Sequence, residues 1–107
     1  MSYKETIKCL KELSHDYYTI YRCITMEHTN ADIGISSIKH AIETNKSKIP
    51  DDLSEYVRLI EFALDQLNQW DNSRQIKRND AAILYLDAIQ HNIECKILPI
   101  LEEKNTP

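Results

Sequence analysis

Apolar residues recur at intervals of three and four along most of the chain, the spacing that places side chains on one face of an α-helix. The spacing predicts four helices, over residues 3–25, 31–45, 52–70 and 79–102. Short polar stretches separate them, and such helices pack most simply as an antiparallel bundle. We therefore expect an all-α antiparallel four-helix bundle, a single domain over residues 1–107 with a tail that frays from about residue 103.

The last predicted helix carries two apolar stripes instead of one. The first stripe consists of Ala82, Leu86, Ile89, Ile93, Ile97 and Ile100. The second consists of Ala81, Leu84, Ala88, His91, Cys95 and Leu98. At about 100° per residue the two stripes lie on roughly opposite sides of the helix. A helix at the edge of a small bundle buries only one of them, so the second is free for a partner unless the other three helices wrap around a central last helix. Pro99 predicts a kink or an end of this helix.

The helix predicted over residues 52–70 also has apolar side chains away from its core face. Phe62 lies about 140° from the centre of that face, with Leu59 between them. Neighbouring helices can combine such residues into one exposed apolar patch, which usually marks an interaction site. The predicted partner-binding residues are Leu59, Phe62, Ala81, Leu84, Ala88, His91, Cys95 and Leu98.

Composition narrows the class of protein. One Gly and three Pro in 107 residues allow few sharp turns, which argues against a β-sandwich or barrel. A net charge of −4 gives no attraction to nucleic acid or anionic lipid, and the one compact basic cluster is Arg74, Lys77 and Arg78. No apolar run reaches the ~18 residues of a membrane span. Three Cys without C-x-x-C spacing, and no apolar leader at the N-terminus, favour reduced thiols in the cytoplasm.

No catalytic motif is present in the sequence. A single Gly excludes a P-loop or a Rossmann turn, so we expect a protein that is not an enzyme and has no cofactor and no small-molecule substrate. His91 and Cys95 are four residues apart and could share one zinc ion, but zinc would need one or two further ligands. We interpret them as members of the second stripe and predict no metal site. A small metal-binding bundle is the alternative.

Three phenols occupy adjacent faces of the first predicted helix, at Tyr17, Tyr18 and Tyr21, next to Arg22. Tyr and Arg are the residue types that contribute most to interface energies. We expect Tyr17 and Tyr21 to pack in the core with their hydroxyls near the surface, and Tyr18 to be exposed.

Together these patterns predict a regulatory interaction module that forms a homodimer or binds another protein through the second face of its last helix. In length and in number of predicted helices the chain resembles the four-helix bacteriocin immunity proteins. That resemblance implies, as an alternative, a bacterial or phage immunity, antitoxin or host-modulating role. It assigns no function to any particular residue.

Overall fold

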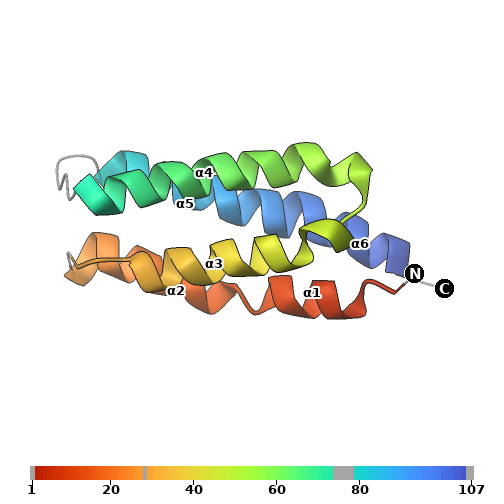
Figure 1. Cartoon of the computed structure of the whole chain (residues 1–107). Coiled ribbons are helices and arrows are strands. Elements are labelled where there is room, and N and C mark those ends of the chain that lie inside the picture. The colour runs from red at the N-terminus through yellow and green to blue at the C-terminus, as the bar shows by residue number, and fades with distance from the viewer. Residues whose placement is uncertain (1, 28, 74–78, 106–107) are drawn as a thin grey trace.

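The computed structural model describes residues 2–27, 29–73 and 79–105, and over these residues the chain forms a four-helix bundle measuring 48 × 22 × 20 Å (Figure 1). The first segment contains α1 (Lys4–Lys11), α2 (Ser14–Arg22) and the π-helical turn η1 (Cys23–Glu27). The second is α3 (Asp32–Asn45), which continues into the 3₁₀ turn η2 (Lys46–Lys48). The third is the 3₁₀ turn η3 (Asp51–Leu53) with α4 (Ser54–Ser73). The last is α5 (Asn79–His91), the π-helical η5 (Asn92–Ile97) and α6 (Leu98–Asn105).

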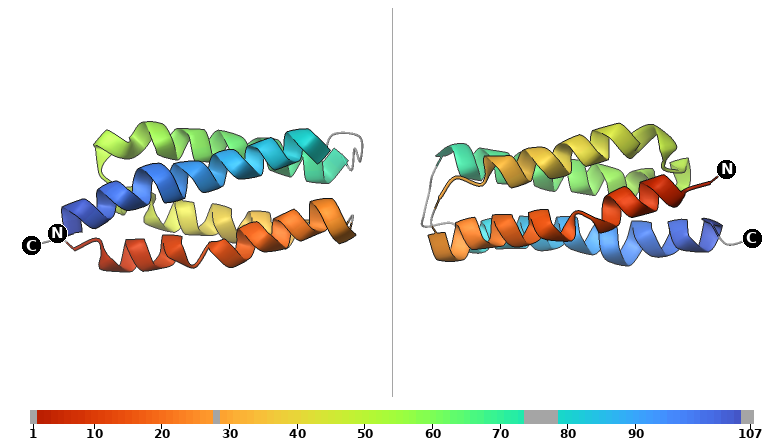
Figure 2. Two further views of the ribbon diagram at one scale, coloured as in Figure 1. Left: turned by 180° about the vertical axis from the view of Figure 1, so that it is seen from behind. Right: turned by 90° about the horizontal axis from the view of Figure 1, so that it is seen from below.

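Successive segments run antiparallel, so both ends of the chain lie at the same end of the bundle (Figure 1). α4 and α5 lie side by side, and α3 packs against both α2 and α4. The last segment closes against the first (Figure 2). There the Tyr3 amide donates to Asn105 Oδ1 at 2.9 Å, and Lys11 Nζ lies 3.2 Å from Glu102 Oε1. No described helix is long and apolar enough to cross a membrane.

Most of the core consists of the apolar stripes that the sequence spacing picks out. Its largest fully buried side chains are Leu10, Ile20, Ile24, Ile38, Ile42, Leu53, Ile60, Leu67, Ile89, Ile93, Ile97 and Leu101. Each of the four segments contributes to this list, so one contiguous core runs the length of the bundle. The predicted fold class is therefore confirmed.

The first segment is not the single helix that the spacing predicts over residues 3–25. A turn at residues 12–13 separates α1 from α2, and the Leu13 amide donates to the Leu10 carbonyl over a tightened three-residue step at 3.3 Å. Leu13 itself remains buried, so the buried apolar stripe continues from α1 into α2 across the turn. Neither residue of the turn is Gly or Pro, and the sequence therefore carries no signal for this break.

Gly34 lies inside α3 because α2 approaches closely there. A Cβ at this position would stand 2.6 Å from Ile20 Cγ1 and 3.4 Å from the Asp16 carbonyl oxygen. Ile20 is fully buried and branched at Cβ, so its side chain has little freedom to move aside. Gly34 thus sets the spacing of two helices, and α3 begins at Asp32 in spite of the weak helix propensity of glycine.

Two side chains hold the first turn of α3. Asn30 Oδ1 accepts a hydrogen bond from the Asp32 amide at 2.8 Å, as expected of a residue that precedes a helix. Asp71 Oδ1, from the distant end of α4, accepts from the Ala31 amide at 2.7 Å. Asp71 and Ala31 are both buried, so this bond joins the start of α3 to the end of α4 inside the protein.

Candidate interaction surface

The most exposed apolar side chains of α4 and α5 are Phe62 (60% exposed), Leu59 (48%) and Leu84 (67%). Phe62 lies on α4 opposite the buried stripe that contains Val57, Ile60 and Leu64. Leu84 lies on α5 opposite the buried stripe that contains Ala82, Leu86 and Ile89. Each helix therefore presents an apolar side chain on the side that it turns away from the bundle.

On the surface of α4, Leu59 lies on the flank of Phe62 that is nearer to the neighbouring helix α5. The α3 side of α4 is marked by Glu61 and Asp65, which line a groove of about 250 Å³ together with residues of α3. Leu59 lies on the other flank of Phe62, toward α5. The apolar part of the α4 surface therefore continues toward α5 and not toward α3.

Ala81 and Ala88 of the predicted surface are half-buried. Ala88 packs against the edge of the core, and its carbonyl accepts a hydrogen bond from Asn92 Nδ2 at 2.7 Å. His91 and Cys95 are exposed. Seven of the eight predicted partner-binding residues therefore reach the surface at least in part, the eighth being Leu98.

Leu98 is a core residue, and its assignment to the exposed stripe is wrong. Its exposed fraction is 6%, whereas Ile100, which the spacing assigns to the core, is only half-buried. The cause is η5, because a π-helical turn holds more residues than an α-helical turn and so rotates every later side chain around the axis. Beyond η5 the buried positions are Ile97, Leu98 and Leu101.

Pro99 does not end the last helix, since α6 continues to Asn105, three residues beyond the predicted end at residue 102. Proline has no amide hydrogen to donate to the carbonyl four residues earlier, here that of Cys95, which lies in η5. The π-helical turn therefore lies where a regular α-helix would lack the hydrogen bond from residue 99 to the Cys95 carbonyl.

His91 and Cys95 are not joined by further metal ligands in the part of the chain that the structure describes. No group of three or more His, Cys, Asp or Glu side chains there is placed to hold a metal ion. Cys9 and Cys23 lie elsewhere in the bundle: Cys9 Sγ is 3.2 Å from Asn45 Nδ2, and Cys23 is buried in η1. His28 and the basic cluster at Arg74, Lys77 and Arg78 lie outside the described residues.

The tyrosines of α2 divide differently from the expectation. Tyr17 is buried, but Tyr21 is 44% exposed and Tyr18 is 56% exposed, so the prediction that Tyr21 belongs to the core is wrong. Tyr21 lies at the edge of the buried stripe that contains Tyr17, Ile20 and Ile24, so the bundle covers it only in part. The Arg22 guanidinium stands 5.7 Å from the centre of the Tyr18 ring, a cation–π arrangement.

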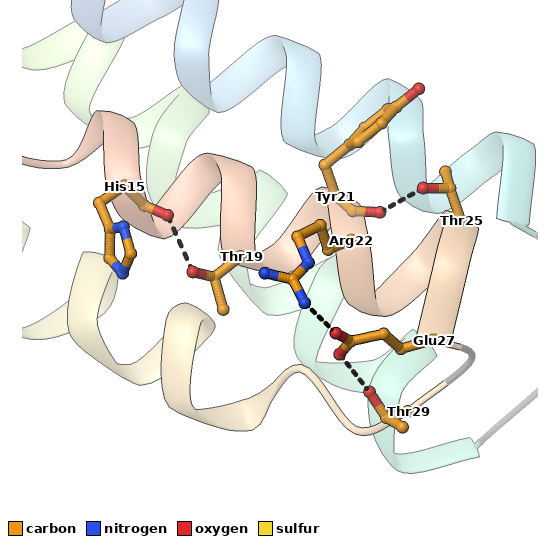
Figure 3. Close-up of polar contacts among 7 residues, drawn as sticks. All are labelled: His15, Thr19, Tyr21, Arg22, Thr25, Glu27 and Thr29. Carbon is orange, nitrogen blue, oxygen red and sulfur yellow. Dashed lines mark hydrogen bonds and ion pairs between the residues drawn. The ribbon is translucent and has the colours of Figure 1, made fainter.

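Polar contacts around Arg22 stabilise this end of the first segment (Figure 3). Arg22 Nη2 pairs with Glu27 Oε1, and Thr29 Oγ1 donates to Glu27 Oε2 at 3.5 Å. Thr19 and Thr25 donate to the carbonyls of His15 and Tyr21, at 2.9 and 2.8 Å. These contacts join side chains of α2, η1 and the following loop to one another and to the backbone of α2, so they stabilise this end of the first segment.

Two charged residues beside Phe62 were not singled out by the sequence patterns. Arg58 and Asp65 are exposed and lie four residues before and three residues after Phe62, which places them on its α3 flank. Arg58 takes part in no ion pair among the described residues. Their positions relative to Phe62 are visible in the sequence, but only the packing shows that all three side chains share an open face.

Comparison of the chain with protein-family models, with curated proteins and with solved structures found no match.

Proposed function

We propose that this protein is a non-enzymatic interaction module that binds another protein chain through the outer face of α4 and α5. This α4–α5 face consists of Leu59 and Phe62 on α4 and Leu84 and His91 on α5, with Cys95 of η5 at its end. The observation that carries the proposal is the position of Phe62 and Leu84, which point away from the core on adjacent helices and are each more than half exposed.

The physical argument is the cost of leaving large apolar side chains in water. At about 25 cal/mol per Å² of apolar surface, covering Phe62, Leu59 and Leu84 would contribute roughly 1–2 kcal/mol for each side chain. Aromatic and aliphatic residues at the centre of a surface, with charged residues at its rim, are typical of protein interfaces. Here the rim is formed by Arg58, Asp65 and Asp87, all of them exposed.

Phe62→Ser and Leu84→Ser test the proposal, with Ile33→Ser as the matched control. Ile33 is 80% exposed, more than either tested residue, but it lies on α3 and outside the α4–α5 face. Sedimentation equilibrium at micromolar concentrations should show association of the wild type and of Ile33→Ser, and loss of association in the other two variants. Circular dichroism should show the same helical content in all four proteins.

A photo-crosslinking side chain extends the test to a partner other than a second copy. A benzophenone side chain at position 62, in the cells that normally produce the protein, should give one discrete adduct, and the same group at position 33 should give none. A wild type that stays monomeric and gives no adduct from position 62 would overturn the proposal.

A further inference from the structure

We infer that the occupant of the α4–α5 face is a second copy of this chain, with the two α4 helices packed antiparallel about a two-fold axis at Phe62. The inference rests on the proposed function and names the partner for it. The charges around Phe62 carry it, because one of the two symmetric arrangements aligns opposite charges more closely than the other does.

Arg58 and Asp65 lie on the same flank of Phe62, one toward each end of α4. Arg58 precedes Phe62 by four residues and Asp65 follows it by three, so their distances from Phe62 along the axis differ by only about 1.5 Å. Both side chains are exposed. Asp65 Oδ2 accepts one hydrogen bond, from Gln69 Nε2 at 3.1 Å, and its other oxygen is open to a cation from outside.

An antiparallel two-fold arrangement reverses the direction of α4 and keeps its two flanks in place. Each Arg58 then faces the partner subunit's Asp65, and symmetry forms the pair twice. On the opposite flank Leu59 meets the uncharged Gln66, and near the centre line of the helix Glu55 meets the uncharged Gln69. Glu61, which lies on the same flank as Arg58 and close to the axis, already pairs with Lys46 of its own chain at 3.1 Å, and Phe62 stacks against its own copy at the centre.

A parallel two-fold arrangement exchanges the flanks and keeps the direction. Arg58 would then face the partner subunit's Leu59, and the nearest carboxylate, that of Glu55 of the partner subunit, lies about 4.5 Å further along the axis. The antiparallel form aligns Arg58 with the partner subunit's Asp65 to within about 1.5 Å along the axis, so the charge pattern favours that form. The position of Phe62 near the middle of α4 also lets the full length of both helices overlap in that form.

Charge reversal tests the arrangement through the variants Arg58→Glu and Asp65→Lys. Each variant alone places two like-charge pairs in the dimer, and we expect its dissociation constant to rise about tenfold. Mixing the two variants in equal amounts restores both opposite-charge pairs, so a heterodimer should form with close to the wild-type dissociation constant. Native mass spectrometry distinguishes the heterodimer from either homodimer by mass. Glu55→Lys is the matched control on the same helix and should change the dissociation constant little, because it faces Gln69.

The outcomes separate this inference from the proposed function. If Phe62→Ser abolishes self-association but the two charge variants do not recover on mixing, the α4–α5 face is an interface and the antiparallel pairing is wrong. If the wild type is a monomer and position 62 crosslinks to a different protein, the second copy is excluded and the interaction function remains. If neither association nor crosslinking depends on Phe62, both are overturned.

Discussion

Tyr17 is a buried residue whose polar atom the bundle leaves unpaired. Only 4% of the residue is exposed, and its hydroxyl has no hydrogen-bond partner in the described structure. A buried hydroxyl that has lost its water and gained no partner costs roughly 1–3 kcal/mol. The packing of the Tyr17 ring therefore stabilises the folded protein, whereas the burial of its unpaired hydroxyl destabilises it.

Tyr17→Phe is expected to keep the fold and to leave the free energy of unfolding at neutral pH unchanged or raised by up to about 1 kcal/mol. The ring keeps its contacts and the unpaired oxygen disappears. Urea unfolding of the two proteins at pH 7 measures the difference. A loss of more than about 1 kcal/mol would show that the hydroxyl makes a stabilising interaction.

The same substitution should remove part of the alkaline sensitivity of the protein. Burial, and then the negative charges of Glu94 and Asp16, raise the pKa of Tyr17 well above its usual value. The unfolded chain releases this proton near pH 10, whereas the folded protein retains it, so the free energy of unfolding falls as pH rises above about 10. In urea unfolding across pH 8–11, Tyr17→Phe should lose less stability than the wild type above pH 10. Parallel curves would contradict the assignment.

At the scale of one element, the last helix shows how a single π-helical turn redistributes side chains. Leu84 lies before η5 and is exposed, whereas Leu98 lies after it and is buried, although their spacing of 14 residues would put them on one face of a regular α-helix. The turn therefore separates the predicted second stripe into a surface part and a core part.

Leu84→Ala and Leu98→Ala provide a direct comparison of the two parts. Loss of a buried leucine side chain should lower the free energy of unfolding by about 2–5 kcal/mol in Leu98→Ala. The exposed Leu84 should change it by less than about 0.5 kcal/mol at concentrations where the protein is monomeric. Chemical unfolding of both variants decides the matter. Equal losses would mean that the helix is regular and central, with both leucines buried.

The helices could be predicted from the sequence because a helix with one buried face needs apolar residues at intervals of three and four, and the Ile and Leu residues of this chain follow that spacing. The turn at residues 12–13 and the rotation at η5 could not be predicted, since neither interrupts the apolar pattern with a Gly or a Pro at the site of the irregularity. Pro99 follows η5 and reads as a helix end in isolation. Tyr21 was misplaced for a different reason: its exposure depends on how far a neighbouring helix covers it.

At the scale of the whole molecule, the bundle is more than twice as long as it is wide, and the α4–α5 face runs along its length. The exposure of Phe62, Leu59 and Leu84 could be anticipated from helical phase alone. That these three side chains share one open face with Arg58 and Asp65 could not be anticipated, because it depends on which flank of α4 is covered by α3 and which by α5. Packing order is set by the tertiary structure and leaves no periodic signal in the sequence.

The two chain ends lie at one end of the bundle, which makes the orientation of a dimer measurable (Figure 1). Spin labels at position 104, introduced as Lys104→Cys with the native cysteines replaced by serine, report from the end of α6. In the antiparallel dimer the two labels lie at opposite ends, at a separation comparable with the 48 Å length of the molecule. In a parallel dimer they lie at the same end, closer together than the combined widths of two bundles that are each about 20 Å thick.

Pulsed electron resonance should give the long distance in the wild-type background and no dipolar signal in Phe62→Ser. A short distance that disappears in Phe62→Ser would show that Phe62 lies at the interface of a parallel dimer.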